Sequence, residues 1–263
     1  MKSAATIDWL TFTLKMVVDP VAVIKDFLAL DPDLFQSQDF GKFGYRKSMY
    51  FAGIFVYFDP AEGRKMEMGV CVSMTGVGCR TYEQHTRLTA AGTPLRALIE
   101  KIHITDMVHC TRLDLALDDK DKLLDLDRIA DCVESGCVNS RIRKRTIYRG
   151  YDGSDRSGTT IYIGAPSSDF RIRFYDKAKE KYKPDDERYY WHWVRLEMVM
   201  RGKNADGCVA AICNSDDLGL LASAILNDKL AFIERDSDSN ISRCQICRWW
   251  LDFVDAVAAV KLV

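Results

Sequence analysis

Hydrophobic and polar residues alternate along several segments of this chain, which is the pattern of β-strands that bury one face. Strands are predicted at residues 7–14, 48–58, 66–75, 111–118, 159–163, 169–176 and 194–199. Apolar residues at helical spacing predict helices at 19–30, 82–102, 126–135, 206–213, 218–226 and 248–260. Gly92 and Pro94 are expected to split the second helix in two, and Gly150, Gly153 and Gly158 are expected to break the strand that ends at Arg149.

The order of these elements predicts the fold class. Strands follow one another without regularly alternating crossover helices, so we expect an α+β architecture with a mainly antiparallel central sheet covered by helices. After Gly202 the pattern turns helical. Residues 1–202 are therefore predicted to form a core, and residues 203–263 a C-terminal helical segment packed on it, together as one continuous globular unit.

Charge is balanced over the whole chain but segregated along it. With 37 basic and 38 acidic residues the formal net charge is -1, so any DNA binding needs a local basic surface. Residues 141–151 interleave basic side chains with Tyr148 and Tyr151, which suits phosphate contacts combined with base stacking. An ordinary exposed β-hairpin would look the same. The candidate DNA-binding residues are Arg141, Arg143, Lys144, Arg145, Tyr148, Arg149 and, on a later strand, Arg171.

Cysteine usage and hydropathy indicate a cytoplasmic protein. The nine cysteines are odd in number, and the single CxxC at Cys244 and Cys247 lacks a second half for a zinc site. Reduced thiols are therefore expected. The sequence has no run of about 18 apolar residues, so no membrane span is predicted. His103, His109 and His192 are isolated and are expected to be structural or surface histidines.

Three predicted strands carry functional groups opposite an apolar row. Asp114 and Asp118 share a face of the first, Arg173 and Tyr175 share a face of the second together with Lys177, and Glu197 lies on the third beside Arg195. Carboxylates suit a hard divalent ion such as magnesium or manganese, and a tyrosine hydroxyl can attack phosphorus and hold the product covalently. Half-exposed strands often carry charges in this way, so solvated faces explain the pattern as well.

The order and wording of six segments resemble the Rep_trans replication initiation factor family. That family includes rolling-circle plasmid and phage initiators and relaxases of some conjugative elements. No single segment is specific, but together they cover nearly the whole chain in order. They are IDWLTFT (7–13), FGYRKSMYF (43–51), TGVGCRTYE (75–83), TRLDLALDD (111–119), TIYIGAPSSDFRIRFYDKAKE (160–180) and HWVRLEMVMRG (192–202).

The resemblance implies a fold related to the rolling-circle nickases and a site-specific endonuclease that cuts and rejoins single-stranded DNA. Tyr175 occupies the position of the nucleophile, which forms a 5′-phosphotyrosine bond. Lys177 and Arg173 flank it as assisting cations. Asp114 and Glu197 match acidic positions of the family and are predicted as metal ligands or water-activating groups, with Asp118 as a weaker ligand that could instead cap the following turn.

Two departures and three alternatives accompany this interpretation. The histidine pair that holds metal in related nickases is missing, and Ser73 and Met74 stand where many relatives carry a glutamate, with Glu67 nearby but not equivalent. The expected partners are single-stranded or hairpin origin DNA, a host helicase in the bacterial cytoplasm and, by resemblance, a second copy in a homodimer. The alternatives are a plasmid or phage initiator, a mobilisation relaxase, and a catalytically silent origin-binding copy-control protein.

Overall fold

The computed structural model describes residues 5–62, 66–87, 93–153, 155–235 and 241–259. The chain forms two compact units that interleave in sequence. Unit 1 comprises Met1–Thr6, Leu115–Val199 and Ser215–Val263, and unit 2 comprises Ile7–Asp114 and Met200–Asn214. Strands β6 (Val108–Asp119) and β11 (Val194–Arg201) each have residues in both units. The predicted boundary at residue 202 falls where β11 ends and helix α6 (Lys203–Cys213) begins.

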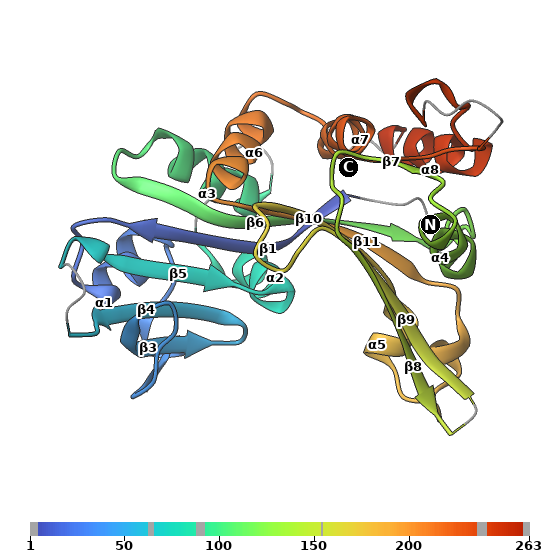
Figure 1. Ribbon diagram of the computed structural model, residues 1–263. Coiled ribbons are helices and arrows are strands. Elements are labelled where there is room, and N and C mark those ends of the chain that lie inside the picture. The colour runs from blue at the N-terminus through green and yellow to red at the C-terminus, as the bar shows by residue number, and fades with distance from the viewer. Residues whose placement is uncertain (1–4, 63–65, 88–92, 154, 236–240, 260–263) are drawn as a thin grey trace. The chain divides into compact units, whose positions relative to one another are not determined.

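In unit 2 the strand order is β2-β3-β4-β5-β1-β6, and the pairs from β2 through to β1 are antiparallel (Figure 1). These strands are β1 (Ala5–Leu14), β2 (Gln36–Gln38), β3 (Tyr45–Phe51), β4 (Ile54–Pro60) and β5 (Val70–Met74). The two faces of β1 differ. Leu10, Phe12 and Leu14 are buried, and the Phe12 ring lies 5.6 Å from that of Phe27. The alternate residues, beginning with Trp9, face the other way.

The single strand predicted at 48–58 is wrong, because this segment is the hairpin of β3 and β4. Ala52 and Gly53 turn the chain with φ values of 38° and 90°. A Cβ atom on Gly53 would lie 2.6 Å from the backbone nitrogen of Gly78, so the turn also needs the missing side chain for space. The segment is apolar on both sides of the turn, and its hydrophobic pattern therefore does not mark the bend.

Unit 2 also contains helices, most of them from the first part of the chain. They are α1 (Pro20–Ala22), the π-helical η1 (Val23–Phe27), the 3-10 helices η2 (Pro32–Leu34) and η3 (Met66–Met68), α2 (Gly76–His85) and α3 (Pro94–Ile104), joined by α6. The predicted split of the 82–102 helix is confirmed. The side chain of Thr93 caps α3 by accepting a hydrogen bond from the backbone nitrogen of Arg96, and Pro94 occupies its first turn. Gly92 lies outside the described residues.

In unit 1 the strand order is β6-β11-β10-β9-β8 (Figure 1). Here β8 is Arg145–Asp152, β9 is Asp155–Ile163 and β10 is Phe170–Asp176, and both of their pairings are antiparallel. The breaks predicted at Gly150 and Gly158 are wrong, since these two glycines face each other within the β8–β9 ladder. The ladder changes register just after Gly150. The glycines therefore allow an irregularity in the pairing of β8 and β9, but they do not end either strand.

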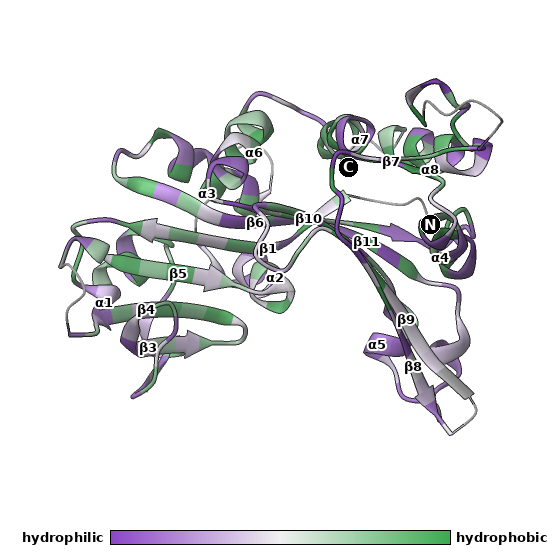
Figure 2. Ribbon diagram, in the orientation of Figure 1, coloured by the Kyte–Doolittle hydropathy of each residue, from purple (hydrophilic) through white to green (hydrophobic). Residues whose placement is uncertain are grey.

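The core of unit 1 lies between the sheet and helices from the end of the chain. The ring of Phe174 on β10 lies 6.1 Å from that of Phe232 and 6.4 Å from that of Trp250. The helices are α4 (Leu126–Glu134), α5 (Lys177–Lys181), η4 (Glu187–Tyr190), α7 (Leu218–Lys229), η5 (Ile241–Arg243) and α8 (Arg248–Ala258). A two-stranded sheet of β7 (Val138–Asn139) and β12 (Ala231–Phe232) was not predicted. Figure 2 shows α5 as mainly hydrophilic, whereas α8 carries hydrophobic residues.

Antiparallel strands and covering helices confirm the predicted α+β class. The nine cysteines all lie in the described ranges, and each is a free thiol, as expected. Within the same ranges, helices long and apolar enough to cross a bilayer are absent.

Candidate active site

Alternation along β10 separates the core of unit 1 from a polar face. Ile172 and Phe174 are fully buried in the core. Arg173 and Tyr175 point to the opposite face, where they pair across the sheet with Tyr162 and Thr160 of β9. The strand parity predicted from the sequence is therefore confirmed for both residues.

The hydroxyl of Tyr175 donates a hydrogen bond to the Oε1 atom of Glu197, at 2.6 Å. Glu197 lies on β11, the neighbouring strand, and its side chain is only 3% exposed. Tyr175 as a whole is 5% exposed. A buried phenol thus faces a buried carboxylate at a distance typical of a charge-assisted O–H···O bond.

Arg173 occupies the other oxygen of the same carboxylate. Its Nε and one terminal nitrogen lie 3.1 and 2.5 Å from Glu197 Oε2. The guanidinium carbon lies 4.4 Å from the centre of the Tyr175 ring. About a third of the Arg173 side chain (35%) is exposed, so the cation borders both the buried pair and the solvent.

Burial and the neighbouring charges determine the protonation of this group of residues. Burial and then the negative charge of Glu197 raise the pKa of the Tyr175 phenol far above its usual range, so Tyr175 is a neutral hydrogen-bond donor. For Arg173, burial works against the charged form, but the charge of Glu197 outweighs it and raises the guanidinium pKa. The guanidinium of Arg173 therefore stays charged, and the proton of the Tyr175 hydroxyl is directed at Glu197 Oε1.

A second carboxylate, Asp118, is held by residues that precede Glu197 on the chain. Arg195 donates from Nε and a terminal nitrogen to the two oxygens of Asp118, at 2.7 and 2.8 Å. Trp193 Nε1 donates to Asp118 Oδ1 at 2.8 Å. The Arg195 side chain is 7% exposed and that of Asp118 is 21% exposed. Strand β11 therefore supplies both Glu197, which accepts from Tyr175, and Arg195, which binds Asp118.

The turn after β6 is capped by Asp119 and not by Asp118. Asp119 accepts hydrogen bonds from the backbone nitrogens of Asp121 and Leu124, at 3.0 and 2.7 Å. Its Oδ2 atom also lies 3.1 Å from His192 Nε2. His192 thus holds a structural turn, in line with the role expected from the sequence.

The predicted metal ligands are each bound by an arginine. Asp114 belongs to unit 2, where Arg112 contacts its two oxygens at 2.9 and 2.6 Å. Within the described ranges, no three His, Cys, Asp or Glu side chains gather closely enough to hold a metal ion. Glu197 and Asp118 are engaged by Arg173 and Arg195, as given above. This arrangement of donors does not fit a divalent cation, and the ligand assignment stays a prediction.

Lys177 begins α5 and does not continue the strand. The helix starts there because the side chain of Asp176 caps it, accepting a hydrogen bond from Lys179 N at 3.0 Å. Lys177 Nζ donates to Glu180 at 2.7 Å and lies 5.5 Å from the centre of the Tyr175 ring. The lysine therefore remains next to the tyrosine, as predicted, but from a helix.

The predicted DNA-binding residues differ in exposure. Three of them precede β8 and are exposed: Arg141, Arg143 and Lys144. Tyr148 is 60% exposed on β8. Arg145 instead donates to the carbonyl of Val138, at 3.2 Å, and burial lowers its pKa. Arg149 pairs with Glu134 at 3.0 Å, and the Arg171 guanidinium lies 3.6 Å from the centre of the Tyr162 ring.

Three residues of this face were not among the predicted site residues. Arg195 and Trp193 hold Asp118, and Tyr162 lies beside Arg173 and Arg171. Arg195 shares the sequence RLE with Glu197, and this spacing is a usable signal because alternate strand residues share a face. The neighbour relation of β9 and β10 that brings in Tyr162 has no local signal beyond the turn between them.

Known proteins are similar to this chain over most of its length. Residues 108–263 match the model of the family described as replication initiation factor, and residues 4–93 match the rolling circle replication initiation protein N-terminal domain. The putative DNA relaxase NicK of Bacillus subtilis (strain 168) is 28% identical over 254 residues, which are 91% of this chain and 68% of the relative. The structure of a rolling circle replication initiator protein from Geobacillus stearothermophilus aligns with a TM-score of 0.86 at 28% identity, over 99% of this chain and 98% of that one. Tyr175 and Glu197 both lie in the longer matched segment. The chain belongs to the replication initiation factor family.

Proposed function

We propose that this protein initiates rolling-circle DNA replication by nicking and rejoining a single DNA strand, with Tyr175 as the nucleophile and Glu197 as its general base. One observation carries the proposal. Tyr175 donates to Glu197 at 2.6 Å, while Arg173 neutralises the other oxygen of that carboxylate. Both residues lie in the segment that matches the replication initiation factor family.

The proposed reaction conserves atoms and charge. The Tyr175 oxygen attacks a backbone phosphorus while its proton moves to Glu197 Oε1. The bond from phosphorus to the 3′ oxygen breaks, and this oxygen takes a proton from water to become a hydroxyl, which leaves a hydroxide ion in the solvent. The products are a 5′-phosphotyrosine and a free 3′ end. Rejoining reverses the sequence, and protonated Glu197 returns the proton to the tyrosine.

Arg173 supports the reaction by its charge and its partial exposure. The developing negative charge on a phosphoryl oxygen is stabilised by a fixed cation in a site with little water. Arg173 contacts Glu197 and covers the Tyr175 ring, and its exposed part can meet a phosphate from solvent. Lys177, 5.5 Å from the ring centre, supplies a second cation beside the phenol.

The proposed steps assign no role to a metal ion. A magnesium or manganese ion would polarise the phosphate if bound. The predicted ligands, however, already carry arginines, and the donor set does not fit such an ion. Metal titration of nicking in Asp114→Ala and Glu197→Ala tests the predicted ligands. A higher metal requirement in either variant supports that assignment, and unchanged metal dependence in both contradicts it.

The proposed substrate is a single-stranded or hairpin origin. Endonuclease activity is consistent with the names of the two relatives, a putative DNA relaxase and a rolling circle replication initiator protein. Exposed Arg141, Arg143 and Lys144 next to exposed Tyr148 suit phosphate and base contacts. A host helicase, a homodimer and a cytoplasmic location stay predictions. The relaxase alternative shares the chemistry and differs in the DNA site.

Covalent capture tests the function. Wild-type protein, mixed with a labelled single-stranded origin oligonucleotide, is expected to form a protein–DNA adduct that survives denaturation and maps to Tyr175. Tyr175→Phe removes only the nucleophilic oxygen and is expected to form none. Tyr190→Phe is the matched control, since Tyr190 is 73% exposed on η4. An adduct that persists in Tyr175→Phe overturns the assignment, and the absence of any adduct in the wild type favours the silent origin-binding protein.

A further inference from the structure

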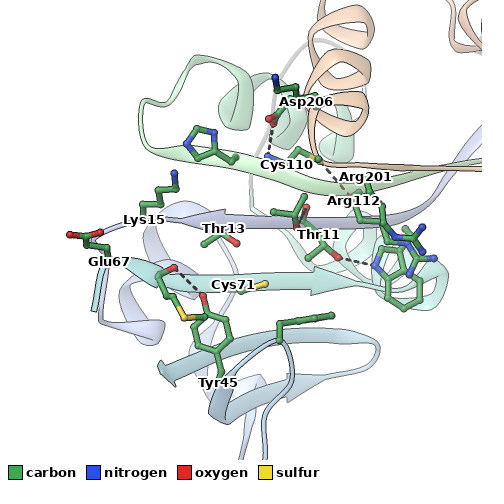
Figure 3. Close-up of a pocket in the computed structure, with 17 residues that line it drawn as sticks. Thr11, Thr13, Lys15, Tyr45, Glu67, Cys71, Cys110, Arg112, Arg201 and Asp206 are labelled. Atoms are coloured by element: carbon green, nitrogen blue, oxygen red, sulfur yellow. Dashed lines mark hydrogen bonds between the residues drawn. The ribbon is translucent and has the colours of Figure 1, made fainter. Parts of the chain in front are cut away.

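Unit 2 contains a cavity of about 820 Å³ that the proposed chemistry does not use (Figure 3). Its volume is within the ~300–1,000 Å³ of ligand pockets. One wall is formed by the outward row of β1, in the order Trp9, Thr11 and Thr13, and by Lys15 just after the strand. Because the other row of β1 is packed in the core, this wall is a sheet face left open to a ligand.

The cavity combines cations with aromatic rings. Among the lining residues, which all lie in described ranges, four are lysine or arginine and two are acidic. The cations are Lys15, Arg112, Arg201 and Lys203. Figure 3 shows Lys15 towards one end of the cavity and Arg112 and Arg201 towards the other. Glu67 lies at the Lys15 end and Arg112 is paired with Asp114, but the lining cations still outnumber the lining acids, which favours a negatively charged ligand.

The aromatic residues are presented in unusual ways. Phe43 lies at the cavity with 58% of its surface exposed and a φ of 59°, a left-handed conformation that a bulky side chain rarely adopts. Such strain is typical of functional positions. The Trp9 ring is covered by the guanidinium of Arg112, 4.0 Å from its centre, and its Nε1 donates to Thr11. Flat rings beside cations suit nucleic-acid bases attached to phosphates.

We propose that this cavity of unit 2 binds nucleotides of single-stranded DNA, with a base against Phe43 or Trp9 and phosphates on Lys15 and Lys203. The inference rests on the proposed function, because it takes the occupant from the DNA strand that the enzyme cuts. Duplex DNA does not fit, since its bases are stacked inside the helix and cannot reach rings within a cavity.

Binding is best measured in a Tyr175→Phe background, where the oligonucleotide stays intact. The test variant combines Lys15→Glu with Lys203→Glu. Both lysines are exposed, and Lys203 is the first residue of α6, where a glutamate interacts favourably with the helix dipole and preserves folding. The matched control combines Lys25→Glu with Lys47→Glu. These lysines are exposed in the same unit but do not line the cavity.

A single-strand phosphate contact contributes about 0.7 to the slope of log affinity against log salt, which corresponds to about fivefold in affinity at 0.1 M salt. Fluorescence anisotropy should therefore show about 25-fold weaker binding for the double variant and a slope that is smaller by about 1.4. Phe43→Ala should weaken binding by at least about fivefold through lost stacking. Oligonucleotides with 5-iodouracil should cross-link to Phe43 or Trp9, as read by mass spectrometry.

The results separate this inference from the proposed function. Affinity and salt slope equal to those of the control, or cross-links only outside the cavity, overturn the cavity site even if wild-type protein forms the covalent adduct. Loss of binding to a free deoxynucleoside monophosphate without loss of binding to the oligonucleotide also overturns it, since the site then serves a free nucleotide. Absence of the adduct in wild type counts against the nicking proposal and leaves the binding result interpretable.

Discussion

Replacing Glu197 with glutamine tests the role of the carboxylate while keeping its shape. In the wild type this side chain is 3% exposed and accepts the phenol proton at 2.6 Å. Loss of a positioned general base typically costs about 10²–10⁴ in rate, or about 2.7–5.4 kcal/mol of activation free energy. Stability should fall by only about 1–2 kcal/mol, because the amide oxygen still accepts from Arg173 while the charge is lost.

The pH profile separates catalysis from packing. Wild-type nicking should change little between about pH 7 and 9, because the proton of Tyr175 passes directly to Glu197 and the phenol need not ionise beforehand. In Glu197→Gln burial, the larger cause, still raises the pKa of Tyr175, but the contribution of the neighbouring negative charge is gone, so the pKa is raised less than in the wild type. The reaction then depends on the ionised phenol, so its rate should rise about tenfold per pH unit.

The assay is single-turnover formation of the covalent adduct with excess protein across this pH range. Glu187→Gln is the matched control, since Glu187 is an exposed carboxylate of the same unit on η4 and should behave as wild type. If Glu197→Gln nicks at a wild-type rate, or loses rate without a change of pH profile, the general-base assignment is refuted. A melting curve close to that of wild type ensures that the lost rate is not lost folding.

Three further predictions concern stability. Phe174→Ala should lower the free energy of unfolding by about 3–5 kcal/mol, because the fully buried ring of Phe174 is part of the core of unit 1. Urea titration measures this loss, and a loss below about 1 kcal/mol would contradict the packing. Asp118→Asn should cost about 2–4 kcal/mol by leaving the buried Arg195 without its charged partner. Asp186→Asn should cost less, because its partner Arg188 is about half exposed, and equal losses would count against a special role for the first pair. Burial raises the pKa of Tyr57 and Tyr82 to about 12, so these phenols lose their protons at lower pH in the unfolded chain than in the folded protein. The melting temperature should therefore fall as pH rises from 10 to 12. Tyr57→Phe and Tyr82→Phe should each lessen this fall, and an unchanged slope of melting temperature against pH in both variants would rule out this cause.

Much of the local structure could be predicted from the sequence. Strand parity placed Arg173 and Tyr175 on one face, because alternate residues of a strand point the same way whatever the neighbours are. Helix starts marked by Thr93 and Pro94 were predictable for the same local reason. The turn at Gly53 and the continuous ladder through Gly150 were not, since a glycine permits a turn and an extended strand alike.

The sequence by itself determined the chemistry that this chain carries: a tyrosine between cations on one strand, carboxylates on two others, and family segments in order. Only the tertiary structure decided which groups meet. Tyr175 and Glu197 are 22 residues apart, and Asp118 and Arg195 are 77 apart. Hydrophobic periodicity specifies the face of a strand but neither its neighbour nor its register, which depend on the packing of the whole sheet. For that reason the arginine partners of Asp114, Asp118 and Glu197, and the hydrogen bond from Tyr175 to Glu197, were not predicted from the sequence.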